Sequence, residues 1–132
     1  KGNLMADDAT LYGALTMSKE LGFLTMLHCE NGDVIDLLQR AFLSSGKTKP
    51  VYHALSRPPE LEDEAVGRAI TFSKMVGVPV YIVHLSSAGA LEKVKLARLN
   101  KLPVYAETCP HYLALSMDKY KLPGFESAKY VM

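Results

Sequence analysis

The sequence predicts an α/β fold in which parallel strands are joined by helices. Three observations indicate this fold: short strand-like segments are apolar throughout, helical patterns separate them, and no hairpin turn lies between them. Strands of this kind are buried on both faces, and their alternation with helices is typical of parallel pairing through right-handed crossovers. With 48% hydrophobic and 22% charged residues, the 132 residues can form the core of one such domain.

The first helix and the first strand are expected close to the start of the chain. A helical pattern covers about residues 8–21, where Asp7 offers N-cap chemistry and Gly22 ends the run. The continuous apolar segment 23–28 follows and precedes a turn-forming pair, so we expect a strand that is buried on both faces. This strand ends at His28.

The same order then recurs along the rest of the chain. The further expected helices cover residues 34–43, 60–75 and 88–100, and the further expected strands cover 80–84 and 104–106. The second strand ends at His84, and the tail from residue 115 to 132 has weak periodicity.

Three strands cannot close a barrel. The unit is therefore either a small open sheet or part of a larger (β/α)8 TIM-type barrel whose other strands lie outside it. The sequence begins with a loop and a helix and ends soon after a strand, with no evident cap at either boundary. We therefore expect residues 1–132 to be an internal segment of a single barrel domain.

Charge and composition exclude several classes of partner. Fifteen basic and fourteen acidic residues give a net charge of +1, and the basic residues are scattered singly, so neither nucleic acid nor an anionic membrane is expected. The apolar runs are too short to span a bilayer, and no signal peptide is recognisable. Cys29 and Cys109 do not make a disulfide framework, so we expect reduced thiols in a cytoplasmic protein.

His28 and His84 are the candidate metal ligands. Each ends an expected parallel strand, so both rings should lie at the same C-terminal edge, where parallel sheets and barrels bind their ligands. Neutral imidazole is the commonest ligand for zinc and related ions, but each ring could equally be a hydrogen-bonded residue that closes its strand. Spacing alone leaves both interpretations open. Two imidazoles are too few for a closed zinc site, so further ligands must come from elsewhere.

Other polar residues near these strands have mainly structural interpretations. Glu30 could orient the ring of His28, and Asp33 is expected to cap the helix that begins at residue 34. Arg57 could pair with a carboxylate near the site and is not expected to be catalytic.

Two further histidines are given no role in the chemistry. Cys109 and His111 lie two positions apart in a segment expected to be extended, where we expect them to shape a loop rather than to serve one atom. His53 is expected at the surface or at an interface.

Four motifs in order resemble the hydantoinase and dihydropyrimidinase family of the amidohydrolase superfamily. The motifs are LHCENGD at 27–33, SRPPE at 56–60, VHLS at 83–86 and ETCPHYL at 107–113. Each is weak alone, but their order and gaps match the family across essentially all 132 residues. The resemblance implies a (β/α)8 barrel with two divalent ions, usually zinc, held by histidines, an aspartate and a carboxylated lysine that bridges the ions.

The resemblance carries two of those metal ligands onto this chain, His28 and His84, and it places no catalytic residue in the segment. The family's His-x-His pair, bridging lysine and aspartate have no counterpart here, and Lys1 is not that lysine, because the family's falls a few residues upstream. The intact parent is expected to open hydantoins or dihydropyrimidines, as in pyrimidine degradation, by attack of a metal-bound hydroxide on the ring amide carbonyl. It is expected to be a homo-oligomer, a tetramer in this family, whereas the 132-residue chain alone is expected to be inactive.

Two alternatives stay open within the resemblance. Allantoinase and dihydroorotase share the histidine arrangement, although the residues after His28 and the Cys-Pro-x-Tyr motif favour hydantoinase or dihydropyrimidinase. The collapsin-response-mediator proteins use the same barrel without catalysis and have lost metal ligands. The presence of both His28 and His84 argues against that non-enzymatic class.

Overall fold

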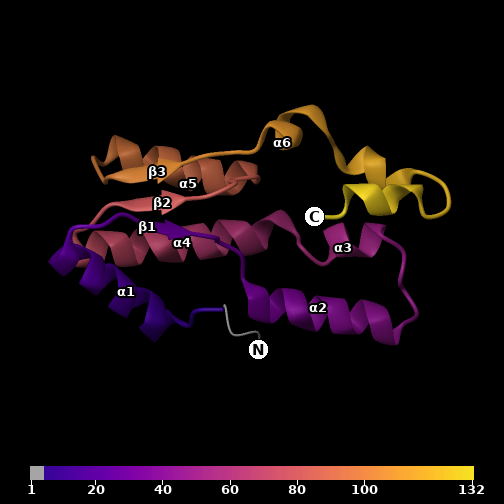
Figure 1. Ribbon diagram of the computed structural model, residues 1–132, viewed down its shortest axis with the longest axis horizontal. Coiled ribbons are helices and arrows are strands. Elements are labelled where there is room, and N and C mark those ends of the chain that lie inside the picture. The colour runs from indigo at the N-terminus through magenta and orange to yellow at the C-terminus, as the bar shows by residue number, and fades with distance from the viewer. Residues whose placement is uncertain (1–4) are drawn as a thin grey trace.

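The computed structural model describes residues 5–132 as a three-stranded parallel sheet with helices packed against it (Figure 1). The strands are β1 (Thr25–Leu27), β2 (Val80–Ile82) and β3 (Val104–Ala106), in that order in the sheet. The helices are α1 (Asp8–Leu21), α2 (Gly32–Ser44), α3 (Val51–Leu55), α4 (Pro59–Val76), α5 (Ala88–Leu99) and α6 (Pro110–Ala114), followed by the 3-10 helices η1 (Met117–Lys121) and η2 (Glu126–Tyr130). The predicted α/β class with three parallel strands is confirmed. Lys1, which the sequence analysis discussed, lies outside the described residues.

The long helices begin and end within two residues of the predicted bounds. The Asp7 carboxylate accepts a hydrogen bond from the backbone N–H of Thr10 at 2.8 Å, which caps α1. Gly22 and Gly77 end α1 and α4 in the left-handed conformation, with φ of 73° and 76°, which glycine adopts without steric cost. No helix within residues 5–132 is both long and apolar enough to cross a membrane.

The N-cap of α2 corrects one expectation. Asn31 caps this helix, since its side-chain oxygen accepts from the N–H of Val34 at 3.2 Å and the helix begins at Gly32. The prediction that Asp33 is the cap is therefore wrong. Asparagine and aspartate cap helices about equally well, so residue type alone does not distinguish Asn31 from Asp33. As a residue of the first turn, Asp33 instead adds negative charge at the positive end of the helix dipole.

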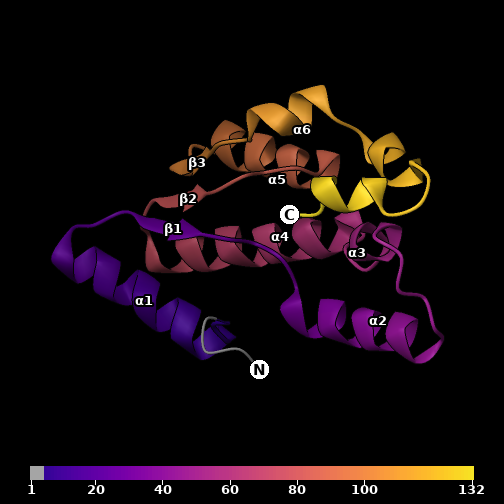
Figure 2. The same cartoon turned by 45° about the vertical axis from the view of Figure 1, so that its right-hand side comes forward.

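The core lies between the sheet and helices α1, α4 and α5, which lie side by side along it (Figure 2). In the central strand β2, Val80 and Ile82 have no exposed surface. The expectation that the first strand is buried on both faces is wrong for the described residues, because Met26 in β1 is 60% exposed. The cause is that the described helices cover only one face of the sheet: Met26 pairs with Tyr81 of the central strand, which is also partly exposed, whereas Val80 and Ile82 point to the covered face.

A close approach between α4 and α5 depends on Gly89. A Cβ atom at Gly89 would overlap the carboxylate of Asp63, which accepts a hydrogen bond from the hydroxyl of Ser87 at the N-cap of α5. Gly89→Ala must displace that carboxylate, so we expect it to destabilise the fold by about 1–3 kcal/mol, the usual cost of overpacking. The measurement is thermal unfolding.

A matched substitution tests the cause. Gly13 lies in the interior of α1, and nothing lies within 4 Å of the Cβ that alanine would add there. We therefore expect Gly13→Ala to raise the thermal midpoint slightly, since glycine in a helix interior costs about 0.5–1 kcal/mol relative to alanine. Equal midpoints for Gly89→Ala and the unchanged protein would contradict the steric argument.

Candidate metal centre

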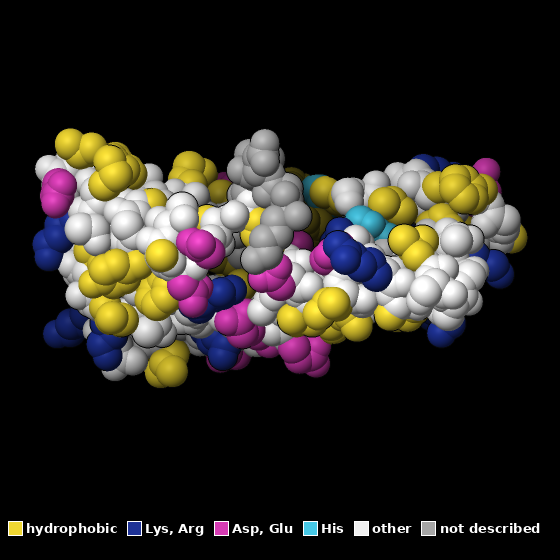
Figure 3. Space-filling view, turned by 90° about the horizontal axis from the view of Figure 1, so that it is seen from below, with side chains coloured by type: hydrophobic (Ala, Val, Ile, Leu, Met, Phe, Trp, Pro, Cys, Tyr) yellow, Lys and Arg dark blue, Asp and Glu magenta, His cyan; other side chains and the backbone are white. Residues whose placement is uncertain are grey.

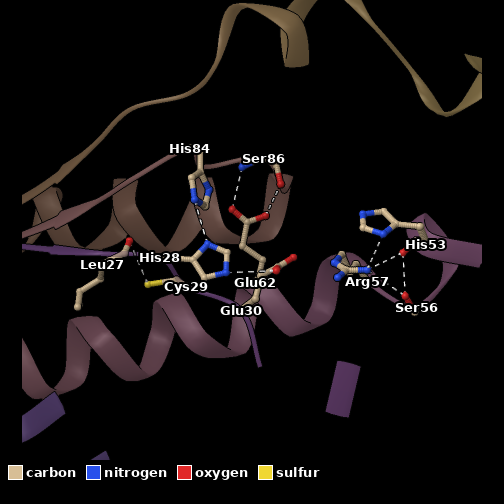
Figure 4. A network of polar contacts seen from close by, with 10 residues as sticks. All are labelled: Leu27, His28, Cys29, Glu30, His53, Ser56, Arg57, Glu62, His84 and Ser86. Atoms are coloured by element: carbon tan, nitrogen blue, oxygen red, sulfur yellow. Dashed lines mark hydrogen bonds and ion pairs between the residues drawn. The ribbon is translucent and has the colours of Figure 1, made fainter. Parts of the chain in front are cut away.

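His28 and His84 meet at the C-terminal edge of the sheet. His28 directly follows β1, and His84 lies two residues beyond β2. Because the two strands are parallel neighbours, both side chains leave the sheet at the same edge (Figure 4). The Nδ1 atom of His28 lies 2.9 Å from the Nε2 atom of His84, and the ring centroids are 4.8 Å apart. The structure thus brings together the two residues that the sequence singled out.

The backbone at His84 is strained. Its φ of 41° lies in the left-handed region, which few residues other than glycine adopt, although asparagine, aspartate and histidine do so more often than most. Such conformations persist only where the surrounding structure enforces them, and they cluster at functional sites. The strain therefore marks His84 as a residue whose placement the fold maintains at a cost in stability.

Glu30 orients the ring of His28. Its carboxylate lies 3.4 Å from Nε2 of His28, on the opposite side of the ring from His84. This contact raises the pKa of His28 and lowers the pKa of Glu30, in each case mainly through the hydrogen bond between the two side chains. A neutral imidazole that donates its Nε2–H to Glu30 leaves the lone pair of Nδ1 directed at His84.

The geometry of the two rings fits a divalent cation. Two nitrogens bound to one tetrahedral zinc ion at about 2.0–2.1 Å lie about 3.3 Å apart, close to the 2.9 Å found here. A small outward movement of either ring would therefore make room for an ion between them. Within residues 5–132, no group of three or more histidine, cysteine, aspartate or glutamate side chains has metal-binding geometry. The described residues therefore bring together two ring nitrogens that could share one ion.

Cys29 is next to His28 in sequence but is not an activated nucleophile. Its side chain is buried, and burial raises the pKa of the thiol to about 12. A thiol with that pKa stays protonated near neutral pH, whereas nucleophilic attack needs the thiolate. Both cysteines are free, as the sequence led us to expect.

A cavity of about 580 Å³ opens beside the two histidines. Histidine side chains emerge near the middle of the face seen in Figure 3. Besides His28 and His84, the cavity lining includes Glu30, His53, Arg57, Glu62, His111, Tyr112, Tyr120 and Met132. Its volume lies within the range of about 300–1,000 Å³ that is common for small-molecule sites.

His53 and Arg57 lie farther along the cavity wall. Arg57 donates to the backbone oxygen of His53 at 3.0 Å and to the hydroxyl of Ser56 at 3.2 Å, and neither of these partners is a carboxylate. Burial, followed by the charge of Arg57, lowers the pKa of His53. His53 therefore faces the cavity, whereas the sequence placed it at the surface or at an interface.

His111 also lines the cavity, which the sequence did not predict. The segment expected to be extended is helical: Cys109 is the N-cap of α6 and Pro110 is its first residue. The Nε2 atom of His111 is buried without a hydrogen-bond partner in the described structure, and its ring contacts Tyr112 edge-on at 4.5 Å. The signal that could have shown this is Pro110, because proline favours the first position of a helix.

Glu62 is a second residue that sequence analysis missed. It lies in the first turn of α4 with 9% of its surface exposed, and its carboxylate contacts the loop that follows His84. Acidic residues in a first helical turn are usual because they complement the helix dipole, so nothing in the sequence distinguished Glu62 from Glu60 or Glu64.

Comparison with known proteins identifies the family. No family model matches the chain. The chain is 53% identical over 131 residues to a D-hydantoinase of Geobacillus stearothermophilus and 46% identical over 131 residues to a D-hydantoinase of Ralstonia pickettii, in both cases over 99% of this chain. It superimposes with a TM-score of 0.96 on a crystal structure of D-hydantoinase at 52% identity, over 98% of this chain and 28% of that one. The chain belongs to the hydantoinase and dihydropyrimidinase family.

A crystal structure of a dihydropyrimidinase from Brevibacillus agri is also similar. The chain superimposes on it with a TM-score of 0.96 at 48% identity, over 98% of this chain and 28% of that one. The chain spans 28% of the length of the Geobacillus relative and 29% of the Ralstonia one. The predicted family and the predicted partial-barrel fold class are thereby confirmed.

Proposed function

We propose that the protein containing this chain hydrolyses cyclic amides of the hydantoin or dihydropyrimidine type, and that His28 and His84 hold one of two divalent ions in its active site. The observation that carries the proposal is the facing pair of ring nitrogens, 2.9 Å apart at the sheet edge and beside a cavity. The D-hydantoinase and dihydropyrimidinase relatives support this substrate class over allantoin or dihydroorotate.

The residues of this chain would bind and orient rather than carry out the chemistry. His28 and His84 would each contribute one nitrogen, and Glu30 would keep the lone pair of His28 directed at the ion. Divalent ions held there, zinc in keeping with imidazole ligands, would supply hydroxide near neutral pH and polarise the amide carbonyl. The remaining ligands, including a carboxylated lysine that bridges the ions, would come from parts of the protein outside this chain.

We further propose that residues 1–132 are one segment of a single barrel domain. The exposed side chains of Met26 in β1 and Tyr105 in β3 support this, since both lie on the sheet face that the described helices leave uncovered. Hydrophobic side chains are also exposed on the surface seen in Figure 3. On α1 the exposed ones include Tyr12, Met17 and Leu21. Further strands and helices of the barrel would cover these faces.

The setting of the intact protein is part of the same proposal. The two free cysteines support a reducing, cytoplasmic compartment. The family resemblance supports a homo-oligomer, with a tetramer as the expected form.

A ring-opening assay tests the proposed reaction. We expect the full-length protein supplied with zinc to hydrolyse hydantoin and dihydrouracil faster than allantoin or dihydroorotate, and to lose activity on chelation. The 132-residue chain alone is the control and is expected to be inactive, because its described part brings only two nitrogens to the ion. Failure of the zinc-supplied full-length protein to open any of these rings would refute the proposal.

A further inference from the structure

Glu62 reaches from one layer of the fold into the loop that carries His84. It belongs to the first turn of α4, whereas the residues that it contacts, Ser86 and Ser87, lie between β2 and α5 (Figure 4). These serines follow His84 by two and three positions. The contact therefore links a buried carboxylate directly to the backbone of the candidate ligand loop.

The carboxylate of Glu62 accepts three hydrogen bonds. The backbone N–H of Ser86 donates to Oε1 at 2.7 Å, and the backbone N–H of Ser87 donates to Oε2 at 2.8 Å. The hydroxyl of Ser86 donates to Oε2 at 2.6 Å. Hydrogen bonds to an ionised acceptor are shorter and stronger than neutral ones, so the three together fix the position of the loop. Both oxygens are engaged by the loop and neither touches an imidazole nitrogen in the described structure.

This arrangement explains how the strain at His84 is maintained. The left-handed φ of His84 persists only where its surroundings enforce it. On one side, Leu85 donates its N–H to the backbone oxygen of Glu107 at 2.7 Å, which ties the loop to the end of β3. On the other side, Glu62 holds the N–H groups of Ser86 and Ser87. The backbone after His84 is thus held from two neighbouring elements.

We propose that Glu62 is a positioning residue for His84: by holding the loop at residues 86–87, it keeps the His84 ring aligned with His28 for a divalent cation. The proposal rests on the proposed metal-binding role of the two histidines. Glu62 acts only through the backbone. Its loss is therefore expected to leave both imidazoles present but to misalign them.

Glu62→Gln is the sharpest substitution, because glutamine has the same shape as glutamate. Each carboxylate oxygen of Glu62 faces a backbone N–H, so either orientation of a glutamine amide would turn its NH₂ group toward a donor. Glu60→Gln is the matched control, since Glu60 lies in the same helical turn but is exposed. Ser86→Ala removes only the hydroxyl donor and should produce a weaker version of the same defect.

The test is a cobalt titration of the metal-stripped full-length protein, followed by visible absorption, which reports affinity and ligand geometry without any assay of activity. We expect Glu62→Gln to weaken Co²⁺ binding by about 10–100-fold, the usual effect of losing a residue that orients a metal ligand, and to alter the absorption band. Ser86→Ala should lie between Glu62→Gln and the unmodified protein, and Glu60→Gln should match the unmodified protein.

The possible outcomes separate the two proposals. Unmodified affinity and spectrum in Glu62→Gln would overturn the positioning role alone. If Glu62→Gln does not fold, Ser86→Ala decides, and unmodified binding in that variant would overturn the role. If the unmodified protein binds Co²⁺ no better than a variant lacking both His28 and His84, the metal-binding function and the role of Glu62 both fail.

Discussion

Replacing His28 and His84 together with asparagine is expected to lower kcat/KM for hydantoin hydrolysis by the full-length protein on the order of 1,000-fold. That factor corresponds to about 4 kcal/mol, within the several kcal/mol that a metal ion contributes to stabilising charge in a transition state. The reason is that the two facing nitrogens, 2.9 Å apart, would no longer be available to bind an ion. Zinc content per chain should fall in the same variant, as measured by atomic absorption.

Asparagine separates the loss of the ligand from a change in the backbone. The left-handed φ of His84 is one that asparagine tolerates well, so the substitution removes the ring without adding strain. His53→Asn is the control for zinc content: His53 lines the same cavity, but its Nδ1 atom lies 3.2 Å from the guanidinium of Arg57. Full zinc content and normal turnover in the double variant would contradict the assignment of both ligands.

The sequence was sufficient to place the two candidate ligands because strand ends are a local property. An apolar run followed by a polar residue marks the end of a buried strand, and parallel pairing brings successive ends to one edge. His28 and His84 needed no further information to be placed together. Their actual contact, Nδ1 of one ring to Nε2 of the other, depends on rotamers and on Glu30, which a linear pattern does not specify.

What the sequence did not reveal depends on contacts between elements distant in the chain. Glu62 and Ser86 are 24 residues apart, and no local signal distinguishes a carboxylate that binds a remote loop from one that faces water. The exposure of Met26 likewise depends on what packs against its face of the sheet, not on the apolar character of β1 itself. Asn31 and Asp33 are equally suited by residue type to cap α2, and the course of the chain after β1 makes Asn31 the cap.

Leu15→Ala is expected to destabilise the protein by about 3–5 kcal/mol, the range found when a fully buried leucine leaves a cavity. Leu15 has no exposed surface and is the buried apolar residue of α1, the helix that packs on α4. Two polar contacts also join α1 to α4: Lys19 donates to the backbone oxygen of Val76 at 2.7 Å, and Arg68 pairs with Asp8 at 2.8 Å. The part-buried hydrogen bond of Lys19 and the exposed ion pair between Arg68 and Asp8 are too weak to replace the apolar contacts that Leu15 makes.

The effect of this substitution should extend to the candidate metal centre, because α1 leads into β1 and His28 directly follows β1. Thermal and urea unfolding of the full-length protein give the loss of stability, and Glu20→Ala, an exposed truncation in the same helix, is the control. We expect the control to stay within about 0.5 kcal/mol of the unmodified protein. A Leu15→Ala midpoint equal to that of the control would mean that α1 does not anchor the strand carrying His28, and the link from helix packing to ligand placement would have to be abandoned.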